Sequence, residues 1–252
     1  MKLEHPITGV TWGITMKSHE RPENNNMALH TCENPEDILA NREVLAQELG
    51  VPLDQFVLAN QTHSDHCHEV TAADQGRGAF SVDTAIPDTD ALFTYEPDLV
   101  LGTFTADCVP MLFWSTSSQV IGSVHSGWQG TVKEIVPKLL VHLKEEKKEE
   151  LSNVHVVLGP ALSQEKFEVD ADVAEKYKVL GYADEWIVYK EETNKYHIDN
   201  AQTVRAQCLR AGILPEHIHV SPVCTFQAAD GFSYRQNKQD GRHLGFIFRH
   251  ND

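Results

Sequence analysis

The sequence predicts a mixed α/β or α+β fold that forms a single domain over residues 1–252. Two observations predict it. Short apolar runs typical of buried strands alternate along the chain with segments of helical periodicity. No internal repeat and no Pro-, Gly- or Ser-rich linker divides the chain, whose 252 residues are enough to bury one substantial core.

The first half of the chain predicts one helix and four strands. Asn34 can cap a helix and Pro35 suits its first position. Glu36 and Asp37 favour the positive end of the helix dipole, and Gly50 ends the helix. Short apolar runs then predict buried strands over 55–59, 99–104, 109–114 and 119–124.

The second half continues the alternation of helices and strands. Helical spacing extends from Val132 to Leu143, where Pro137 should bend the helix or mark its effective start. The run 144–150 mixes both charge signs and predicts a solvated helix end rather than a binding patch. The other elements expected are helices over 170–180 and 199–211 and strands over 154–158 and 218–223.

The C-terminal segment predicts a β-hairpin. Asp240-Gly241 is a turn signal, and the apolar run over 244–248 after it is typical of a strand. The segment Gly231-Phe232-Ser233-Tyr234-Arg235 before the turn would supply the other arm. We therefore expect the last strand to pair with residues close to it in sequence.

Charge balance and cysteine content limit the classes of protein to consider. The formal net charge is −16 at pH 7, so a surface that binds nucleic acid by neutralising phosphates is not expected. No apolar run is long enough to span a membrane, and residues 1–13 lack the apolar core of a signal peptide. The five cysteines are an odd number without a C-x-x-C pair, which indicates reduced thiols. We expect a soluble, cytoplasmic protein.

Two histidines and one cysteine suggest a catalytic metal site. His63, Cys108 and His125 each lie where a predicted strand ends or is broken. A catalytic zinc takes three ligands of the His, Cys or carboxylate type and leaves one position open for water or substrate. The separations of 45 and 17 residues match none of the short zinc motifs, so the fold would have to assemble the site.

Each member of this triad also has a plainer explanation. A buried cysteine usually packs inertly, and a single histidine at a strand end usually faces solvent or makes a hydrogen bond. Cys108 could instead be a nucleophile activated by His125, as in an amide hydrolase acting on a peptidoglycan precursor. A third alternative is a structural metal in a non-enzymatic binding module. The residues alone leave these alternatives open.

Other metal and nucleotide motifs are weaker or absent. His66 and His68 form a His-x-His pair of the kind that binds copper, and we expect them on one face of a strand near the site. A blue-copper site, however, needs two His, a Cys and usually an axial Met in a defined geometry. The sequence has no H-x-E and P-C-x-x-C elements of a zinc deaminase, no phosphate loop and no serine-hydrolase elbow. Copper is therefore less expected than zinc.

Three arginines and one aspartate are candidates for handling charge at the site. Arg235 and Arg242 lie in turn-like segments, where a bidentate donor can hold a phosphate or a carboxylate. Arg42 has less support from the residues alone. Asp107 directly precedes Cys108 and is a candidate proton carrier or orienting residue.

Several sequence blocks occur in a fixed order along nearly the whole chain. The most specific are Gln61-Thr62-His63, Thr105-Ala106-Asp107-Cys108-Val109-Pro110 and His125-Ser126-Gly127-Trp128. The others are Asp90-Ala91-Leu92-Phe93-Thr94, Gly159-Pro160, Cys224-Thr225 and Ser233-Tyr234-Arg235 with Gly241-Arg242. Together they resemble the YfiH-like laccase-domain ("polyphenol oxidase") family of purine nucleoside phosphorylases.

The resemblance implies a fold, a metal and a reaction. The fold would be α+β, a single domain with two mixed β-sheets flanked by helices in α/β/β/α layers. Zinc would be held by His63, Cys108 and His125. The reaction would be phosphorolysis of adenosine, inosine or methylthioadenosine to base and ribose 1-phosphate, with some adenosine deamination. The partners would be a purine nucleoside and phosphate, and the protein a monomer or small homo-oligomer.

The resemblance also implies roles for residues around the metal. Asn41-Arg42 matches a recurrent family position, so Arg42 joins Cys108 and Asp107 as a catalytic candidate. The residues implied to bind substrate are Gln61, Arg235 and Arg242.

This sequence departs from the family pattern at two arginines. Gln129 stands where the family has an arginine after His-Ala-Gly-Trp, and Ser126 replaces the alanine of that block. Gln236 replaces a second arginine. Because a lost arginine removes a fixed charge that can hold an anion, these changes bear on the substrate more than on the metal.

Overall fold

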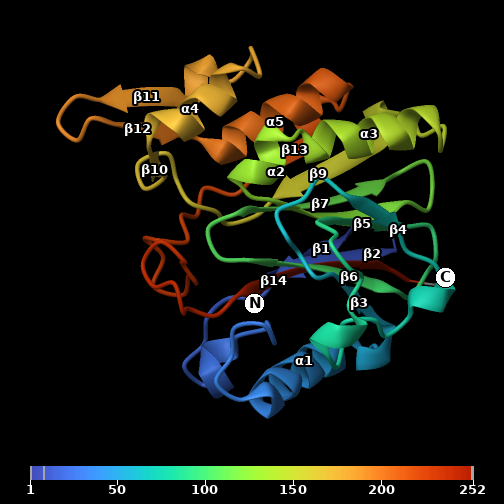
Figure 1. Cartoon of the computed structure of the whole chain (residues 1–252). Coiled ribbons are helices and arrows are strands. Elements are labelled where there is room, and N and C mark those ends of the chain that lie inside the picture. The colour runs from blue at the N-terminus through green and yellow to red at the C-terminus, as the bar shows by residue number, and fades with distance from the viewer. Residues whose placement is uncertain (1, 8, 251–252) are drawn as a thin grey trace.

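Two β-sheets lie face to face between two layers of helices (Figure 1). The computed structural model describes residues 2–7 and 9–250, with side chains from residue 9 onward. The order of layers is helix, sheet, sheet, helix, which confirms the predicted α+β fold class with α/β/β/α layers. A small third sheet, which the sequence did not predict, projects from one end.

The first sheet has five strands and is mixed. Its order is β1-β2-β14-β6-β3, and only the pair formed by β3 and β6 is parallel. The strands are β1 (Lys2–Ile7), β2 (Val10–Ile14), β14 (His243–Arg249), β6 (Val100–Thr105) and β3 (Phe56–Leu58).

The predicted C-terminal hairpin is wrong. β14 lies inside the first sheet and pairs with β2 on one side and β6 on the other. Its side chains are buried on both faces: Phe246 packs toward α1 (Pro35–Leu49), and Ile247 packs between the sheets. A strand buried on both faces needs two long neighbours, which residues 231–235 do not provide. That segment instead wraps over the end of the sheets and contacts Asp107.

The second sheet has six strands in the order β13-β9-β7-β8-β5-β4. Its parallel pairs lie at the two edges, and the four central strands are antiparallel. All seven residues of β7 are buried because the strand is central and covered on both faces. The strands are β13 (Ile218–Val220), β9 (Val154–Leu158), β7 (Val109–Ser115), β8 (Ile121–Ser126), β5 (Ala91–Thr94) and β4 (Cys67–Glu69).

Helix α1 covers the first sheet and begins and ends as predicted. The Asn34 side chain accepts a hydrogen bond from the Glu36 amide, and Gly50 closes the helix in the left-handed conformation. The helix buries Leu45 against the first sheet. In Figure 1 it forms the layer opposite the other four helices.

The second sheet is covered by α2 (Trp128–Val132), α3 (Ile135–Glu145) and α5 (Asn200–Ala211). The predicted helix over 132–143 is divided at Glu134, whose φ is 61°, and Pro137 lies in the first turn of α3. Pro137 therefore marks a helix start, as expected. Beyond these helices, α4 (Ala171–Lys178) packs with the antiparallel third sheet, formed by β10 (Glu168–Val169), β12 (Lys195–Ile198) and β11 (Ile187–Lys190).

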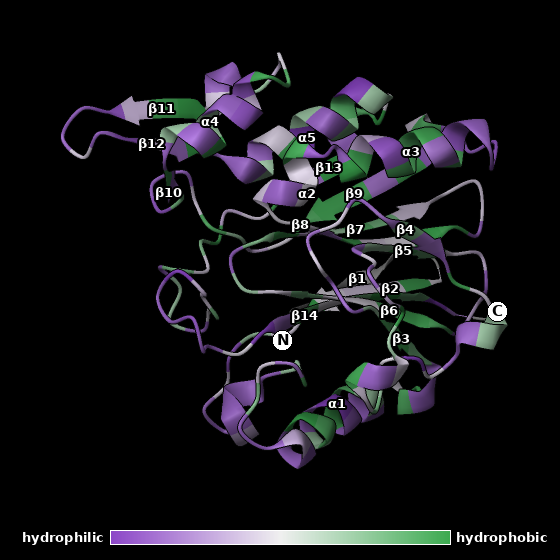
Figure 2. Ribbon diagram, in the orientation of Figure 1, coloured by the Kyte–Doolittle hydropathy of each residue, from purple (hydrophilic) through white to green (hydrophobic). Residues whose placement is uncertain are grey.

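The apolar residues form continuous layers between these elements. Figure 2 shows the hydrophobic colour concentrated on the strands and on the helix faces that meet them. One cluster lies between the second sheet and α3, a second between the sheets, and a third beneath α1. Each fully buried Phe or Leu side chain, such as Phe113 or Leu139, contributes about 1.5–3 kcal/mol. This packing fixes the strand ends on which the site is built.

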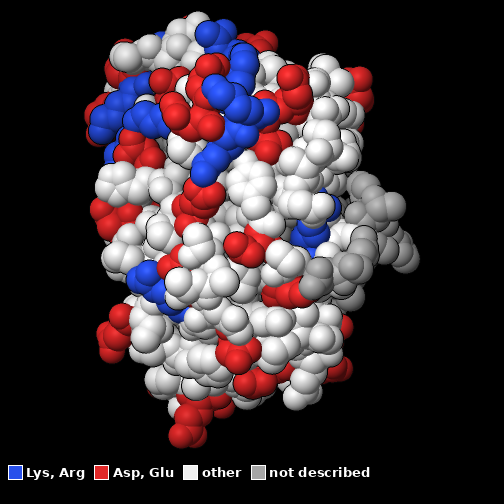
Figure 3. Space-filling model, turned by 90° about the vertical axis from the view of Figure 1, so that its right-hand side faces the viewer, with Lys and Arg blue, Asp and Glu red and all other residues white. Residues whose placement is uncertain are grey.

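The surface drawn in Figure 3 carries cations interleaved with carboxylates. Lys and Arg gather in the upper part with Asp and Glu among them, and acidic residues dominate the lower part. Among the ion pairs are Lys138 with Asp65 and Lys147 with Glu69. Among the described residues, no helix combines the length and the apolar character needed to cross a bilayer.

Candidate metal centre

The structure brings His63, Cys108 and His125 together at one end of the two sheets. Their ligand atoms all lie within 4.8 Å of one another. His63 Nε2 is 4.0 Å from Cys108 Sγ, and the two imidazole rings meet edge to face with centroids 4.8 Å apart. Among the described residues this is the one group of three or more His, Cys, Asp or Glu side chains arranged to hold a metal ion.

The route of the chain between the sheets explains this convergence. His63 lies where the chain leaves β3 of the first sheet for β4 of the second. Cys108 lies where it leaves β6 of the first sheet for β7 of the second. The register of β7 on β8 places Val109 opposite Ser126 and Pro110 opposite His125, so Cys108 arrives beside the third ligand. Residues distant in sequence therefore meet at one end of the sheets.

Two backbone positions, one in the triad and one directly before Cys108, are left-handed although neither is glycine. His63 has a φ of 59° and Asp107 a φ of 90°. Such conformations cost on the order of 1–3 kcal/mol and persist only where neighbouring contacts hold them. Carboxylates make those contacts at both positions.

Asp90 is buried and accepts hydrogen bonds from both sides of the site. Its carboxylate accepts from His125 Nδ1 at 2.7 Å and from the amides of residues 62, 63 and 64 at 3.1, 3.2 and 2.7 Å. Burial alone would raise the pKa of Asp90, but the hydrogen bonds from His125 and Ser64 lower it to about 2. The carboxylate is therefore ionised at neutral pH.

The charges of Cys108 and His125 are coupled. Burial disfavours the charged form of both, but attraction between the thiolate and the imidazolium outweighs burial. The pKa of Cys108 falls to about 6, with His63 adding to the effect, and the pKa of His125 rises to about 9. The thiolate is the form of cysteine that binds a metal.

Gly127 leaves room for the ligands. A Cβ at this position would lie 2.8 Å from Cys108 Sγ and 2.9 Å from His63 Cδ2, closer than side chains tolerate. The Gly127 backbone therefore forms one wall of a cradle around the triad. Together with two imidazoles and a thiol, this cradle fits a metal of intermediate softness such as zinc.

Asp107 connects distant loops to the neighbouring Cys108 through hydrogen bonds. Its carboxylate accepts hydrogen bonds from Thr225 Oγ1 and from the Arg235 amide, each at 2.7 Å. Its carbonyl accepts from the Leu162 amide at 2.9 Å. These contacts hold the left-handed conformation of Asp107 and fix the adjacent Cys108.

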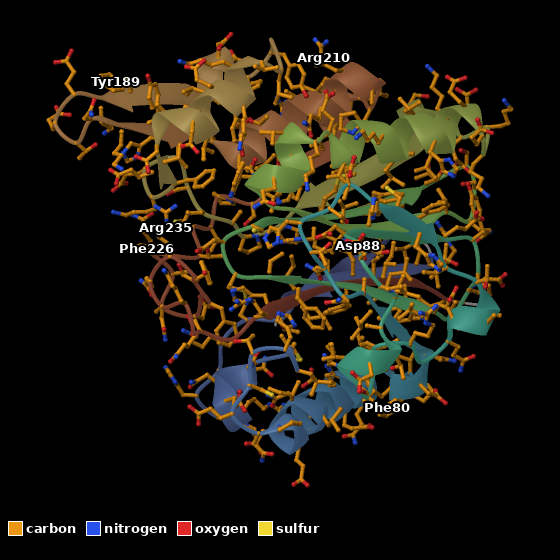
Figure 4. The ribbon with its side chains drawn as sticks, viewed as in Figure 1. Phe80, Asp88, Tyr189, Arg210, Phe226 and Arg235 are labelled. Carbon is orange, nitrogen blue, oxygen red and sulfur yellow. The ribbon has the colours of Figure 1, made fainter. Side chains whose placement is uncertain are left out.

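The structure places two of the three predicted arginines at the rim of the site. Arg235 is exposed and donates to the Glu168 carbonyl at 2.9 Å, and Figure 4 shows it near Phe226 on the loops that extend past the sheet ends. Arg242 is half-buried, and its guanidinium lies over the Tyr234 ring. Burial lowers the pKa of Arg242, while the charges of Cys108 and Asp107 act in the opposite direction. Arg242 is therefore electrostatically coupled to the triad.

Arg42 and Gln61 are both engaged with the backbone. Arg42 is 1% exposed and donates to the carbonyls of Met27, Gly78 and Ala79 at 2.6–2.9 Å. The Gln61 amide donates to the Phe104 carbonyl at 2.8 Å and accepts from the Phe104 amide at 2.7 Å. In the structure these residues hold segments behind the site.

His66 and His68 do not join the triad. His66 precedes β4 rather than lying in it, so the expectation of a shared strand face is wrong. The His66 ring contacts Asp88, at 3.0 Å from its carboxylate, and the His68 ring contacts Asp74 at 3.2 Å. Each of the two histidines is paired with a carboxylate, and neither belongs to the group of His63, Cys108 and His125.

Sequence reasoning missed several residues around the site. Asp90 directly precedes β5 and was noted only as part of a motif; a carboxylate just before an apolar run was the available signal. Lys133 donates to the His63 carbonyl at 2.7 Å. The His30 ring contacts Phe104 edge to face, and desolvation together with Arg242 lowers its pKa. Nothing local in the sequence marks Lys133 or His30.

A cavity of about 620 Å³ lies beside the rim of the site. Its walls include Cys32, Phe232 and Lys238, and also Asp240 and Gly241, whose carbonyls accept hydrogen bonds from Arg242. The triad residues do not line it. It therefore adjoins Arg242 rather than the metal ligands.

Comparison with known proteins gives consistent matches over most of the chain. A chain from Bacillus subtilis (strain 168) named "Purine nucleoside phosphorylase YlmD" is 31% identical, over 93% of this chain and 87% of that protein. Its namesake from Geobacillus stearothermophilus is 32% identical, over 97% and 92%. The crystal structure of the Bacillus licheniformis hypothetical protein YfiH superposes with a TM-score of 0.90 at 31% identity, covering 95% of this chain and 92% of that one.

A family model agrees with these relatives. The family described as "Multi-copper polyphenol oxidoreductase laccase" matches residues 9–250, which include the triad and its supporting residues. The structural match extends over both sheets and the helical layers, since it covers nearly the whole chain. The chain therefore belongs to the YfiH-like laccase-domain family.

Proposed function

We propose that this protein is a metal-dependent purine nucleoside phosphorylase. It would cleave adenosine, inosine or methylthioadenosine with phosphate to give the base and ribose 1-phosphate, with adenosine deamination as an accompanying activity. The observation that carries the proposal is the convergence of His63, Cys108 and His125 within 4.8 Å. The names of the relatives support the reaction class, because they are purine nucleoside phosphorylases related over most of the chain.

Zinc is the metal we propose. Three protein ligands with a further position open are typical of catalytic zinc, which would act as a Lewis acid toward phosphate or lower the pKa of a bound water. Copper is the alternative that the ligand set also allows, since two His and a Cys occur in blue-copper sites. The metal content of the purified protein distinguishes the two.

The surrounding residues would position the reactants. Arg242, half-buried and coupled to the triad, would anchor the anionic co-substrate, and Arg235 would extend the anchor at the rim. Asp107 would orient Cys108 and the loops that it ties together. Arg42 and Gln61 would act as positioning residues, because their hydrogen bonds hold the backbone behind the site.

The test compares a ligand variant with a matched control. In the His63→Ala, Cys108→Ala double variant we expect zinc and nucleoside turnover to be lost together. His66→Ala removes an exposed histidine of the same loop and should retain both. Chromatography with and without phosphate separates adenine, the product of phosphorolysis, from inosine, the product of deamination. Full turnover by the double variant would refute the proposal.

A second function is favoured by one specific arrangement. His125 lies between the Asp90 carboxylate and Cys108, which is the order of a nucleophile, a base and an orienting group in cysteine hydrolases. Such an enzyme would cleave an amide, for example in a peptidoglycan precursor. Two observations together would rule against this alternative. Bound zinc would protect Cys108 from a cysteine-directed label, and no acyl-enzyme would form with any amide substrate.

A further inference from the structure

A single buried carboxylate joins the two histidines of the triad, and we propose that Asp90 is the positioning residue that sets the ligand geometry before a metal binds. The proposal rests on the metal centre proposed above and not on the reaction. Asp90 is 2% exposed and makes all its side-chain hydrogen bonds to the residues 62–64 and to His125. None of these hydrogen bonds involves Cys108, and the only triad side-chain atom among the partners is His125 Nδ1.

One oxygen of Asp90 contacts both histidine residues. Oδ1 accepts from His125 Nδ1 at 2.7 Å and from the His63 amide at 3.2 Å. Because Nδ1 of His125 is engaged, Nε2 is the nitrogen left to bind a metal. A carboxylate on the far nitrogen of a metal-binding imidazole fixes the ring orientation and raises its basicity.

The other oxygen holds the loop that carries His63. Oδ2 accepts from the Thr62 amide at 3.1 Å and from the amide and hydroxyl of Ser64, both at 2.7 Å. Three consecutive amides thus converge on one carboxylate, which holds His63 at its left-handed φ of 59°. Each contact presents a donor to the carboxylate. The amide side chain of Asn in Asp90→Asn would place its own N–H group against at least one of these donors.

The neighbouring Asp88 provides a comparison on the same loop. Asp88 is exposed, accepts from the Thr62 hydroxyl and pairs with His66, yet it contacts neither histidine of the triad. If Asp90 only stabilised the loop, replacing Asp88 or Asp90 should affect metal binding to a similar degree. If Asp90 sets the ligand geometry, only its replacement should weaken metal binding.

The backbone of Asp90 is held independently of its side chain. The Asp90 amide donates to the His66 carbonyl at 3.1 Å, and the Asp90 carbonyl accepts from the His125 amide at 2.7 Å. A side-chain substitution therefore leaves these main-chain bonds in place. Asp90→Asn changes the charge and the donor pattern while the start of β5 stays anchored.

The experiment measures metal affinity rather than activity. Apo forms of the wild type, Asp90→Asn and Asp88→Asn are titrated with zinc in competition with a chromophoric chelator, and the cobalt-substituted forms are compared by absorption. We expect Asp90→Asn to bind zinc about 10–100-fold more weakly, with a changed cobalt spectrum, and Asp88→Asn to bind like the wild type. Equal zinc affinity and an unchanged cobalt spectrum in Asp90→Asn would overturn the inference.

Ser64→Ala keeps the test decisive if Asp90→Asn does not fold. This variant removes one hydroxyl donor to Oδ2 without changing charge, and its zinc affinity should fall in the same direction by a smaller factor. Unchanged affinity in Ser64→Ala would then overturn the inference. If the wild type itself binds neither zinc nor cobalt, the proposed metal centre is wrong and the inference falls with it. If the wild type and Asp90→Asn bind zinc equally well, the inference about Asp90 is wrong while the proposed metal centre stands.

Discussion

Among the side chains that the structure describes, two pairs of histidine rings lie close together, and they differ in what surrounds them. His63 and His125 meet edge to face at 4.8 Å, beside the Cys108 thiol and the buried Asp90 carboxylate. His155 and His217 stack at 3.8 Å, and the stack continues onto Trp114, whose ring lies 5.5 Å from His155. In the second pair His217 Nδ1 is buried without a hydrogen-bond partner among the described residues.

The different surroundings shift the pKa values of the two imidazoles of His125 and His155 in opposite directions. Burial opposes charge on His125, yet attraction to Cys108 and Asp90 raises its pKa to about 9. Burial and the neighbouring His217 lower the pKa of His155. Proximity of two imidazoles is therefore not enough for a metal site. A thiolate to share the ion and a carboxylate to fix the ring are what distinguish the first pair.

The largest effect is expected from removing the thiolate. Cys108→Ser replaces a soft anionic ligand by a hydroxyl, so zinc affinity should fall by more than the roughly 100-fold that loss of an outer partner costs. Zinc content after dialysis and competition titration measure this. Cys67→Ser, at an exposed cysteine, is the matched control and should bind zinc normally. If Cys108→Ser kept the zinc affinity of the wild type, the thiolate would not be what distinguishes the first histidine pair from the second.

A fifth histidine, His243, tests the rule that the hydrogen-bond partners of an imidazole set its charge. His243 is fully buried, donates from Nδ1 to the Thr15 carbonyl and accepts at Nε2 from the Phe232 amide, so only the neutral ring fits. Burial lowers its pKa from 6.5 to about 4.

The unfolded chain therefore binds the His243 proton between pH 6.5 and 4 while the native state does not. The free energy of unfolding should fall by about 3 kcal/mol as the pH drops across this window. Urea titrations at several pH values measure the slope, which His243→Gln should reduce. An unchanged slope in that variant would show that His243 does not titrate as its contacts require.

A steric change should disturb the first pair without altering any ligand. Gly127→Ala would place a methyl group 2.8 Å from Cys108 Sγ and 2.9 Å from His63 Cδ2. Overpacking of this kind costs about 1–3 kcal/mol, so zinc affinity should fall by about fivefold or more. Gly130→Ala in the same turn meets its nearest atom at 3.4 Å and serves as control. Equal zinc affinity in the two variants would mean that the cradle is looser than the structure shows.

The smallest effect is expected at the second pair. His217→Ala removes one stacked ring and should lower the free energy of unfolding by about 0.5–1.5 kcal/mol. Zinc affinity should not change, because neither His155 nor His217 belongs to the triad. Thermal unfolding and zinc titration of this variant check both statements. A loss of zinc binding would show that the two histidine pairs are coupled.

The elements predicted well from the sequence are those with local signals. Helix α1 was predicted from its cap at Asn34 and its end at Gly50. The triad was expected because its residue types occur at strand ends, and the chain route between the sheets brings them together. In contrast, β14 pairs with strands far away in sequence, and the short strands of the third sheet lack a continuous apolar pattern.

Long-range hydrogen bonds decided the remaining positions. Arg42 can be buried because the carbonyls of residues 78 and 79 accept hydrogen bonds from its guanidinium. No sequence pattern near position 42 predicts these partners. Asp90 acquires its place only when residues 62–64 and His125 approach from other elements. Positions of this kind depend on tertiary contacts, which composition and periodicity do not encode.

We propose that the His63–Cys108–His125 site binds zinc and that nucleoside cleavage requires this zinc. The most direct measurement follows inosine phosphorolysis by the purified protein as isolated, after chelation, and after zinc is restored, with bound metal counted at each stage. We predict about one zinc per chain, loss of hypoxanthine and ribose 1-phosphate formation on chelation, and recovery on adding zinc. Full phosphorolysis by protein free of metal, or recovery with copper alone, would contradict the claim.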